Sequence, residues 1–296
     1  DSILTLFRSF SANTDDEKPP LARWLAKVES GLGLFDLELN SSPILAAKTL
    51  SSTLWNRCYG AVLTSATLTA LGRFDRFAMR TGLYDDASFE VVPSPFAHAE
   101  AAQLVVPAMA CDGGDPEAHT HALIETLPKI LDPDAGSLVL FASRKQMHAV
   151  YDALPEAWRK RTIAQGELPK KDILQRHREA LDEGRGSVIF GLASFAEGVD
   201  LPGHYCSHVV IAKIPFAVPE DPVEEALAEW VSRNNGNPFM DITVPDAAIK
   251  LVQASGRLLR NEQDRGRISI LDRRIVSRHY GRKMLASMPP YQQIVE

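Results

Sequence analysis

Ser137-Leu138-Val139-Leu140-Phe141 is a short run of apolar, β-type residues, and a helical pattern over residues 145–154 follows it closely. This pair of patterns recurs along the chain. Short buried strands that alternate with helices are typical of a parallel α/β sheet, which is the fold class we predict. The predicted strands are residues 61–63, 104–106, 137–141, 161–164, 188–190, 208–212 and 268–271, and the predicted helices are 117–131, 145–154, 170–183, 222–233, 246–260 and 277–288.

The composition is that of an ordinary soluble enzyme domain. The 296 residues are 45% hydrophobic and 24% charged, a length that allows one large domain or two. No apolar stretch approaches the roughly 20 residues needed to cross a bilayer, and the start lacks the features of a signal peptide. We therefore expect a cytoplasmic protein without a membrane partner.

Charge and cysteine content limit the classes of site. The net charge is -6, so any nucleic-acid contact must come from a local groove of arginines and backbone amides. Cys58, Cys111 and Cys206 lie far apart in sequence. This spacing argues against a disulfide framework and against a four-cysteine iron–sulfur site within the chain, and we expect buried free thiols.

Near the end of the chain, the run Gln253-Ala254-Ser255-Gly256-Arg257-Leu258-Leu259-Arg260 carries two arginines three residues apart. In a helix this spacing would place both guanidinium groups on one face. A guanidinium matches phosphate oxygens, and a transferring phosphoryl group is stabilised by such a cation. Two solvated charges on a surface helix are the alternative.

Three further segments precede this run in a fixed order: Thr64-Ser65-Ala66-Thr67-Leu68, Val139-Leu140-Phe141-Ala142-Ser143, and Gly191-Leu192-Ala193-Ser194-Phe195-Ala196-Glu197-Gly198-Val199-Asp200. The order resembles motifs III, IV, V and VI of superfamily 2 helicases. The residues of the last two motifs are similar to those of the DinG branch of the XPD-type DNA helicases, and especially to those of its YoaA members. The resemblance extends from about residue 41 to the end.

The resemblance implies a RecA-like fold and a division of the chain. Residues 1–40 would be a remnant of the arch region or a linker, and residues 41–92 the last segment of motor domain one with its Ser-Ala-Thr motif. Residues 93–296 would form motor domain two. The implied activity is that of an ATP-dependent, 5′-to-3′ DNA helicase of repair or replication, acting on single-stranded or forked DNA in the bacterial cytoplasm at the nucleoid.

The resemblance also assigns residues to nucleotide chemistry. Arg260 would be the arginine finger, with Arg257 beside it, and Gln253 would couple nucleotide state to domain position, unless it is a plain surface amide of the helix. The segment Glu197-Gly198-Val199-Asp200 follows a predicted strand, where open α/β sheets place ligand contacts. Asp200 could accept a hydrogen bond from the ribose or from an arginine of the last motif.

Other residues are assigned to DNA. Ser143, Arg144 and Ser194 follow predicted strands and are candidates for binding DNA phosphates. A helix N-cap serine or a solvated cation is the alternative at each position. By family position, Ser65 and Thr67 would link ATP hydrolysis to DNA movement.

Several elements of a complete motor are missing from the sequence. It contains no Gly-Lys dipeptide and therefore no P-loop. Asp272 follows the predicted strand 268–271, and we interpret it as a structural carboxylate, ion-paired with Arg273 or Arg274. By resemblance, ATP and Mg²⁺ would be shared with a missing N-terminal motor domain, which would also hold a 4Fe-4S cluster. The chain alone should be catalytically silent.

Two alternatives concern other parts of the chain. His204, Cys206 and His208 alternate as metal ligands could, but Pro202 and Gly203 suggest a loop with no fourth ligand nearby, so we predict no metal site. A non-catalytic RecA-like docking module is the rival function. In that case the apolar tail, residues 278–296, would bind a replication protein such as the clamp-loader chi subunit, or else pack on the chain's own sheet.

Overall fold

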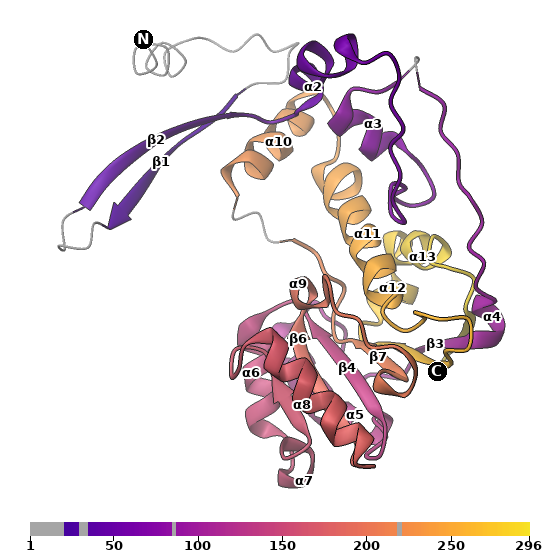
Figure 1. The fold of residues 1–296 in the computed structure, drawn as a ribbon. Helices are drawn as coiled ribbons and strands as arrows, with labels where there is room; N and C mark the ends of the chain where they lie inside the picture. The colour runs from indigo at the N-terminus through magenta and orange to yellow at the C-terminus, as the bar shows by residue number, and fades with distance from the viewer. Residues whose placement is uncertain (1–20, 30–34, 85–86, 218–220) are drawn as a thin grey trace. The chain divides into compact units, whose positions relative to one another are not determined.

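The computed structural model describes residues 21–29, 35–84, 87–217 and 221–296. By its contacts the chain divides into two compact units (Figure 1). Unit 1 comprises Asp1–Glu90 and Ala217–Pro245, and unit 2 comprises Val91–Phe216 and Asp246–Glu296. Residues 217–245, which we assigned to motor domain two, thus make their contacts with unit 1. The functional division itself stays a prediction.

Unit 2 contains a seven-stranded sheet in the order β5-β6-β4-β7-β8-β3-β9. Every neighbouring pair is parallel. The predicted α/β class is therefore confirmed, and six of the seven predicted strands are present in it. The strands are β3 (Ala102–Val106), β4 (Gly136–Phe141), β5 (Thr162–Ala164), β6 (Ser187–Leu192), β7 (His208–Ile211), β8 (Gly266–Ile270) and β9 (Gln292–Val295).

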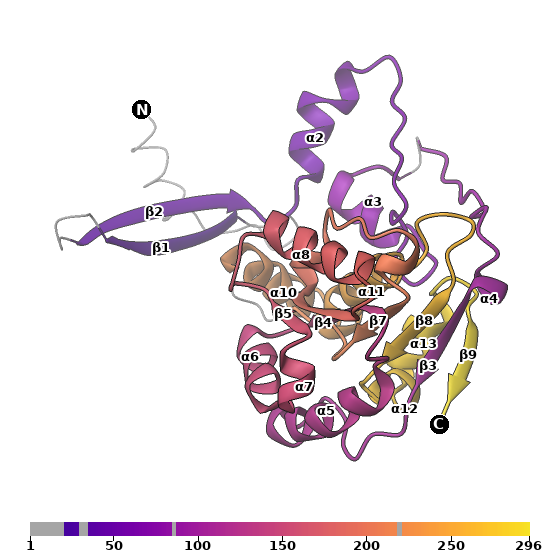
Figure 2. The ribbon, with the colours of Figure 1, turned by 60° about the horizontal axis from the view of Figure 1, so that its bottom comes forward.

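Helices cover both faces of this sheet, as Figure 2 shows for α8 on one side and α5 to α7 on the other. Alternate residues of a strand point to opposite faces. Accordingly, Val139 and Phe141 of β4 and Phe190 of β6 pack against Leu127 and Met147 of the α5–α6 layer. The long central strands are buried along their whole length, which explains their continuous apolar sequence.

The predicted helices 117–131, 145–154 and 170–183 are present in unit 2 as α5, α6 and α8. Asp115 caps α5 by accepting hydrogen bonds from the N–H groups of Glu117 and Ala118, and Pro116 occupies the first turn. The helices are α4 (His98–Ala101), α5 (Pro116–Ile130), α6 (Arg144–Ala153), α7 (Glu156–Arg159), α8 (Lys170–Asp182), α9 (Ala193–Ala196), η2 (Gly203–Tyr205), α11 (Val244–Ser255), α12 (Arg274–Ser277) and α13 (His279–Ala286).

The C-terminal tail packs on its own sheet. Met284, Leu285, Met288 and Tyr291 are buried, and β9 pairs with β3. Tyr291 Oη also donates a hydrogen bond of 3.3 Å to Ser255 Oγ in α11. Of the two alternatives for residues 278–296, packing within the chain is confirmed for these side chains. They no longer support a docking module.

Unit 1 is built around a β-hairpin and a helix. The hairpin joins β1 (Leu21–Glu29) to β2 (Phe35–Pro43) in antiparallel register. Ala22 of β1 and Ile44 pack with Leu227 and Val231 of the helix α10. The remaining elements are α2 (Ala47–Thr53), η1 (Trp55–Arg57), α3 (Asp75–Thr81), α10 (Pro222–Arg233) and the π-helix η3 (Phe239–Thr243).

Two predictions for unit 1 were wrong. Residues 61–63 do not form a strand, and Val62 is 94% exposed. An isolated strand is not stable, and no strand lies beside these residues among those the structure describes. Cys58, expected to be buried, is exposed, whereas Cys206 in unit 2 is buried and Cys111 is intermediate.

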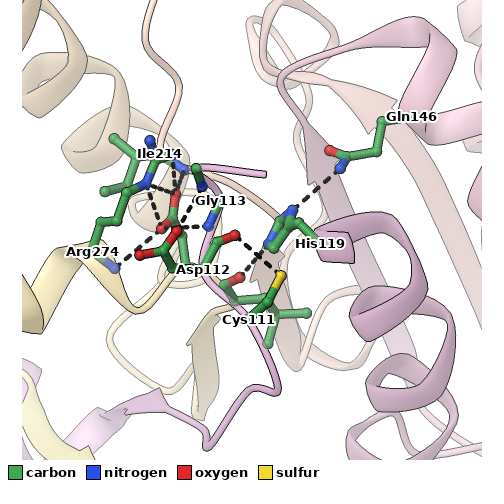
Figure 3. Close-up of polar contacts among 10 residues, drawn as sticks. Cys111, Asp112, Gly113, His119, Gln146, Ile214 and Arg274 are labelled. Atoms are coloured by element: carbon green, nitrogen blue, oxygen red, sulfur yellow. Dashed lines mark hydrogen bonds and ion pairs between the residues drawn. The ribbon is translucent and has the colours of Figure 1, made fainter. Parts of the chain in front are cut away.

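At the carboxyl ends of β3, β7 and β8, unit 2 contains a buried polar network (Figure 3). The Asp272 side chain has no exposed surface and pairs with Arg274 at 2.7 Å. Its Oδ1 and Oδ2 also accept hydrogen bonds from the N–H groups of Gly113 and Ile214. Burial by itself would raise the pKa of Asp272, but the bonds and charge of Arg274 outweigh it and the pKa is lowered. The structural interpretation of Asp272 is confirmed, with Arg274 as its partner.

No described helix has the length and apolar character that a membrane span requires.

Two buried histidines give the fold a pH-dependent stability. His177 of α8 contacts Ser187 Oγ and the carbonyl of Tyr205, and His208 of β7 contacts Ser269 Oγ of β8. Burial, assisted by Arg178 and Arg267 respectively, lowers the pKa of each histidine to about 4.

We predict that the free energy of unfolding falls as the pH drops from about 6.5 toward 4, because in this window the unfolded chain binds protons that the folded chain excludes. Stability is fully present above the unfolded pKa. Urea unfolding between pH 7.5 and 4.5 measures the slope. His177→Gln should flatten it, whereas replacement of the exposed His279 by Gln should not. Equal slopes for His177→Gln and the unsubstituted protein would contradict the assignment.

Candidate functional site

Two segments of unit 2 meet at one end of the sheet: residues 197–200, which follow α9, and residues 256–260, which follow α11. The Nε of Arg260 donates a hydrogen bond of 2.8 Å to Oδ1 of Asp200. The Nη1 of Arg257 donates one of 3.1 Å to the carbonyl of Val199. Motifs that lie some sixty residues apart are thereby joined, and an arginine of the last motif was one of the two partners considered for Asp200.

The helical basis of that prediction was wrong. We expected a helix over residues 246–260, but α11 ends at Ser255, so neither arginine lies on a helix face. The chain tightens after Ser255, where the N–H of Arg257 bonds the carbonyl of Ala254 and that of Leu258 bonds Ser255. Burial of Leu258 and Leu259 holds this turn in place.

The two arginines have different environments. The Arg257 Nε is buried without a hydrogen-bond partner among the described residues, and burial followed by the charge of Arg260 lowers the Arg257 pKa. The charges of Asp200 and Glu197 oppose this shift. The Arg260 side chain is 37% exposed, and only its Nε pairs with Asp200. Arg260 is therefore the more exposed of the two arginines.

A buried carboxylate that sequence reasoning missed supports this turn. Asp264 Oδ2 accepts hydrogen bonds from the N–H groups of Arg260 at 2.7 Å and Asn261 at 2.8 Å. Its Oδ1 accepts one of 3.0 Å from the N–H of Gly203, in the loop after Asp200. Asp264 fixes both segments, and nothing in its sequence neighbourhood distinguishes it from a surface loop carboxylate.

The segment 197–200 is also fixed from α8. Arg178 Nη2 donates a hydrogen bond of 2.7 Å to the carbonyl of Asp200, and Lys170 Nζ donates one to the carbonyl of Glu197. Gly198 adopts φ +68°, a conformation that glycine tolerates best. Gln253 is half-buried in the last turn of α11, four residues before Arg257. Neither Lys170 nor Arg178 was selected from the sequence.

The residues predicted to bind DNA lie around a separate pocket. Arg144 and Ser194 both line a cavity of about 300 Å³. Ser143 caps α6, its hydroxyl accepting a 3.5 Å hydrogen bond from the N–H of Gln146, so the capping alternative holds for this residue. Ser65 and Thr67 lie in unit 1, where the N–H of Thr67 bonds Ser65 Oγ at 3.4 Å.

The histidine–cysteine set does not form a metal centre. His204 contacts Asp182 at 3.4 Å, whereas His208 bonds Ser269, and Cys206 is buried with its pKa raised by burial to about 12. Among residues 21–29, 35–84, 87–217 and 221–296, no three His, Cys, Asp or Glu side chains gather as metal ligands would.

Comparison with known proteins gives a family match and curated relatives. A family model described as the helicase C-terminal domain matches residues 127–291. The ATP-dependent DNA helicase DinG of Photobacterium profundum is 43% identical over 95% of this chain and 41% of that protein. DinG of Escherichia coli is 32% identical over 92% of this chain and 38% of that protein. The chain thus spans about two fifths of these relatives, and the resemblance to DinG-type helicases is confirmed.

Solved structures agree on the fold. A structure described as an XPD helicase has a TM-score of 0.60 at 17% identity. The match covers 86% of this chain and 46% of the chain in that structure. S. tokodaii Xpd4 has a TM-score of 0.58 at 15% identity. The match covers 88% of this chain and 50% of the Xpd4 chain. At these identities the likeness shows the fold alone.

We predict that Asp264→Ala lowers the free energy of unfolding by about 1–3 kcal/mol, because it removes the charged acceptor of three part-buried N–H groups. Urea unfolding at pH 7 measures the loss, with the exposed Glu262→Ala as the matched control. Equal stability of the two variants would show that Asp264 does not hold the turn.

Proposed function

Because this chain belongs to the family of helicase C-terminal domains, we propose that it is the C-terminal motor part of an ATP-dependent DNA helicase. The observation that carries the proposal is the cluster in which Arg260 and Arg257 meet the segment 197–200. The named relatives are ATP-dependent DNA helicases. We further propose that the helicase unwinds DNA with 5′-to-3′ polarity. It would act on single-stranded or forked DNA during repair or replication in the bacterial cytoplasm.

In this function Arg260 is the arginine finger. Its terminal nitrogens form no hydrogen bond with the residues that the structure describes, while its Nε is oriented by Asp200. A guanidinium oriented in this way can stabilise the charge that develops on a transferring phosphoryl group. Arg257, more buried and bonded to Val199, positions the segment and adds positive potential.

The neighbouring residues then bind and sense the nucleotide. Asp200 is exposed enough to accept a ribose hydroxyl through its second oxygen. Glu197 and Gly198 form the backbone that faces the nucleotide, and Gln253 couples nucleotide state to the position of the domains. Ser65 and Thr67 of unit 1 transmit hydrolysis to DNA movement.

The remaining parts of the ATP site come from elsewhere in the complete helicase. The sequence has no Gly-Lys pair to make a phosphate-binding loop. Asp182-Glu183, an acidic pair of the kind that can hold Mg²⁺, lies before β6 and not at the carboxyl end of a strand. We therefore assign the lysine loop, the Mg²⁺ ligands and the 4Fe-4S cysteines to an N-terminal motor domain. Residues 41–92 would be the last segment of that domain, preceded by arch-region residues.

DNA would be gripped by unit 2 at the ends of β4 and β6. Arg144 supplies a cation and Ser194 a hydroxyl, which contact phosphates without reading bases. Closure of the two motor domains over ATP, and their opening after hydrolysis, would alter this grip and move the strand.

The test uses the full-length protein that carries this chain. Arg260→Ala should lower the turnover number for ATP by about 10³-fold or more, because a finger acts in the transition state, with much less effect on nucleotide binding. Single-turnover hydrolysis with single-stranded DNA measures the rate. The exposed Arg176→Ala is the matched control.

Asp200→Asn removes the ion pair but leaves the Arg260 guanidinium in place. If Arg260 served only to hold Asp200, the two substitutions would lower the turnover number equally, and an unchanged turnover number in Arg260→Ala would also refute the role. The 296-residue chain alone should not hydrolyse ATP above background. DNA-stimulated hydrolysis by the chain alone would refute the division of the ATP site.

A further inference from the structure

The chain enters unit 2 through a short segment that becomes buried only at its end. Unit 2 begins at Val91, and residues 88–95 are exposed and form neither helix nor strand. Phe96 is the first half-buried side chain after this stretch, and α4 begins two residues later at His98. The helix α4 packs against β3 and β9 (Figure 2). The entry segment, residues 91–98, is therefore anchored on unit 2 at Phe96 and His98.

The anchor consists of three aromatic rings. The rings of Phe96 and His98 meet edge to face with their centroids 6.0 Å apart, and the rings of His98 and Tyr291 do so at 5.3 Å. Such contacts stabilise packing beyond the burial of apolar area. Burial lowers the pKa of His98, so its imidazole is neutral at pH 7.5 and packs without a charge. The ring of Tyr291 thus holds the end of the entry segment.

The hydroxyl of Tyr291 reaches the last residue of α11. Its Oη donates a hydrogen bond of 3.3 Å to Ser255 Oγ, and the Ser255 hydroxyl donates one of 2.9 Å to the carbonyl of Val252. Ser255 has no exposed surface and Tyr291 is only 6% exposed, so solvent does not compete for these bonds. One side chain therefore contacts both the entry segment and the end of α11.

Ser255 is also the first residue of the turn that carries both arginines, which we call the arginine turn (residues 255–260). The carbonyl of Ser255 accepts a hydrogen bond of 3.1 Å from the N–H of Leu258. At the other end of the turn, Asp264 accepts a hydrogen bond from the N–H of Arg260. The Tyr291 hydroxyl thus fixes the beginning of the arginine turn, and Asp264 fixes its end.

We propose that Tyr291 is a positioning residue for Arg260, which holds the arginine turn through Ser255 and couples it to the entry segment through His98. A displacement of the entry segment moves the Tyr291 ring, and the hydroxyl transmits that movement to Ser255 and the turn. This inference rests on the proposed helicase function, and it adds to that function a residue outside the four motifs.

The first experiment removes single hydroxyls in the full-length protein. Tyr291→Phe keeps the ring but loses the bond to Ser255, and Ser255→Ala removes the acceptor. Each should lower the maximal rate of ATP hydrolysis with single-stranded DNA about 3–10-fold, a factor of the size that one neutral hydrogen bond supplies. The KM for ATP should change less than twofold. The double variant should be no slower than Ser255→Ala alone, because the two substitutions remove the same bond.

The matched control is Tyr151→Phe. Tyr151 is a half-buried tyrosine of unit 2 whose hydroxyl bonds Glu167 and whose ring packs on Phe190 of the sheet. This substitution removes a bonded hydroxyl in the same way but leaves the arginine turn untouched. It should change neither the maximal rate nor the KM, and a fall in rate equal to that of Tyr291→Phe would overturn the positioning role.

The second experiment tests the coupling to the entry segment. His98→Ala removes the ring that contacts Tyr291, and His98→Phe restores an aromatic edge at that position. The first should lower the maximal rate about threefold and the second should not. Because His98 and Ser255 each contact Tyr291, the effects of His98→Ala and Ser255→Ala should deviate from additivity by at least twofold. Additive effects would overturn the coupling.

A readout that does not depend on activity tests whether Tyr291 holds the turn. Hydrogen exchange of peptides that contain the N–H of Leu258 should be faster in Tyr291→Phe, whereas peptides of β4 should exchange as in the unsubstituted protein. Circular dichroism melting confirms that each variant is folded. A lower melting temperature with an unchanged maximal rate would show a role in stability alone and would overturn the positioning role.

The two readouts separate this inference from the proposed function. If the unsubstituted protein does not hydrolyse ATP with single-stranded DNA, the helicase function fails, while faster exchange in Tyr291→Phe would still support the contact of Tyr291 with the turn. Unchanged exchange in Tyr291→Phe would overturn the inference, whatever the rate of ATP hydrolysis.

Discussion

The architecture of unit 2 depends on the requirement that every strand of its sheet be parallel. Parallel strands need crossover connections, so helices cover both faces, and all carboxyl ends reach the same edge. The order β5-β6-β4-β7-β8 then places the loops after β4, β5 and β6 side by side, although they are distant in sequence. The pocket of Arg144 and Lys170 and the segment 197–200 both result from this arrangement.

Around that edge, cationic side chains donate hydrogen bonds to backbone carbonyls as well as to a carboxylate. The carbonyls of Glu197, Val199 and Asp200 accept from Lys170, Arg257 and Arg178, and only the Arg260–Asp200 contact is an ion pair. Carbonyl acceptors satisfy the donors without neutralising the cations. Lys170, Arg257 and Arg178 therefore keep their charge within a chain whose net charge is negative.

Much of the fold could be predicted because buried parallel strands are continuously apolar, as in 137–141 and 188–190. An arginine of the last motif, one of the two hydrogen-bond partners considered for Asp200, is found in the structure as Arg260. Prediction failed where a partner decides the outcome. Residues 61–63 have a strand's composition but no neighbouring strand among the described residues, and the helical periodicity before Ser255 does not reveal that buried leucines bend the chain there. Asp264 and Lys170 were missed because their roles depend on loops far away in sequence.

The position of β3 has a consequence for biosynthesis. This strand lies between β8 and β9, so its first partner begins 160 residues after its own last residue. At a translation rate of roughly 5–20 residues per second, β3 leaves the ribosome about 10–30 s before it can pair. During that interval Leu104 and Val106, which are fully buried in the finished sheet, are presented to solvent on an open strand edge. The nascent chain therefore cannot bury this strand within its sheet until β8 has been made.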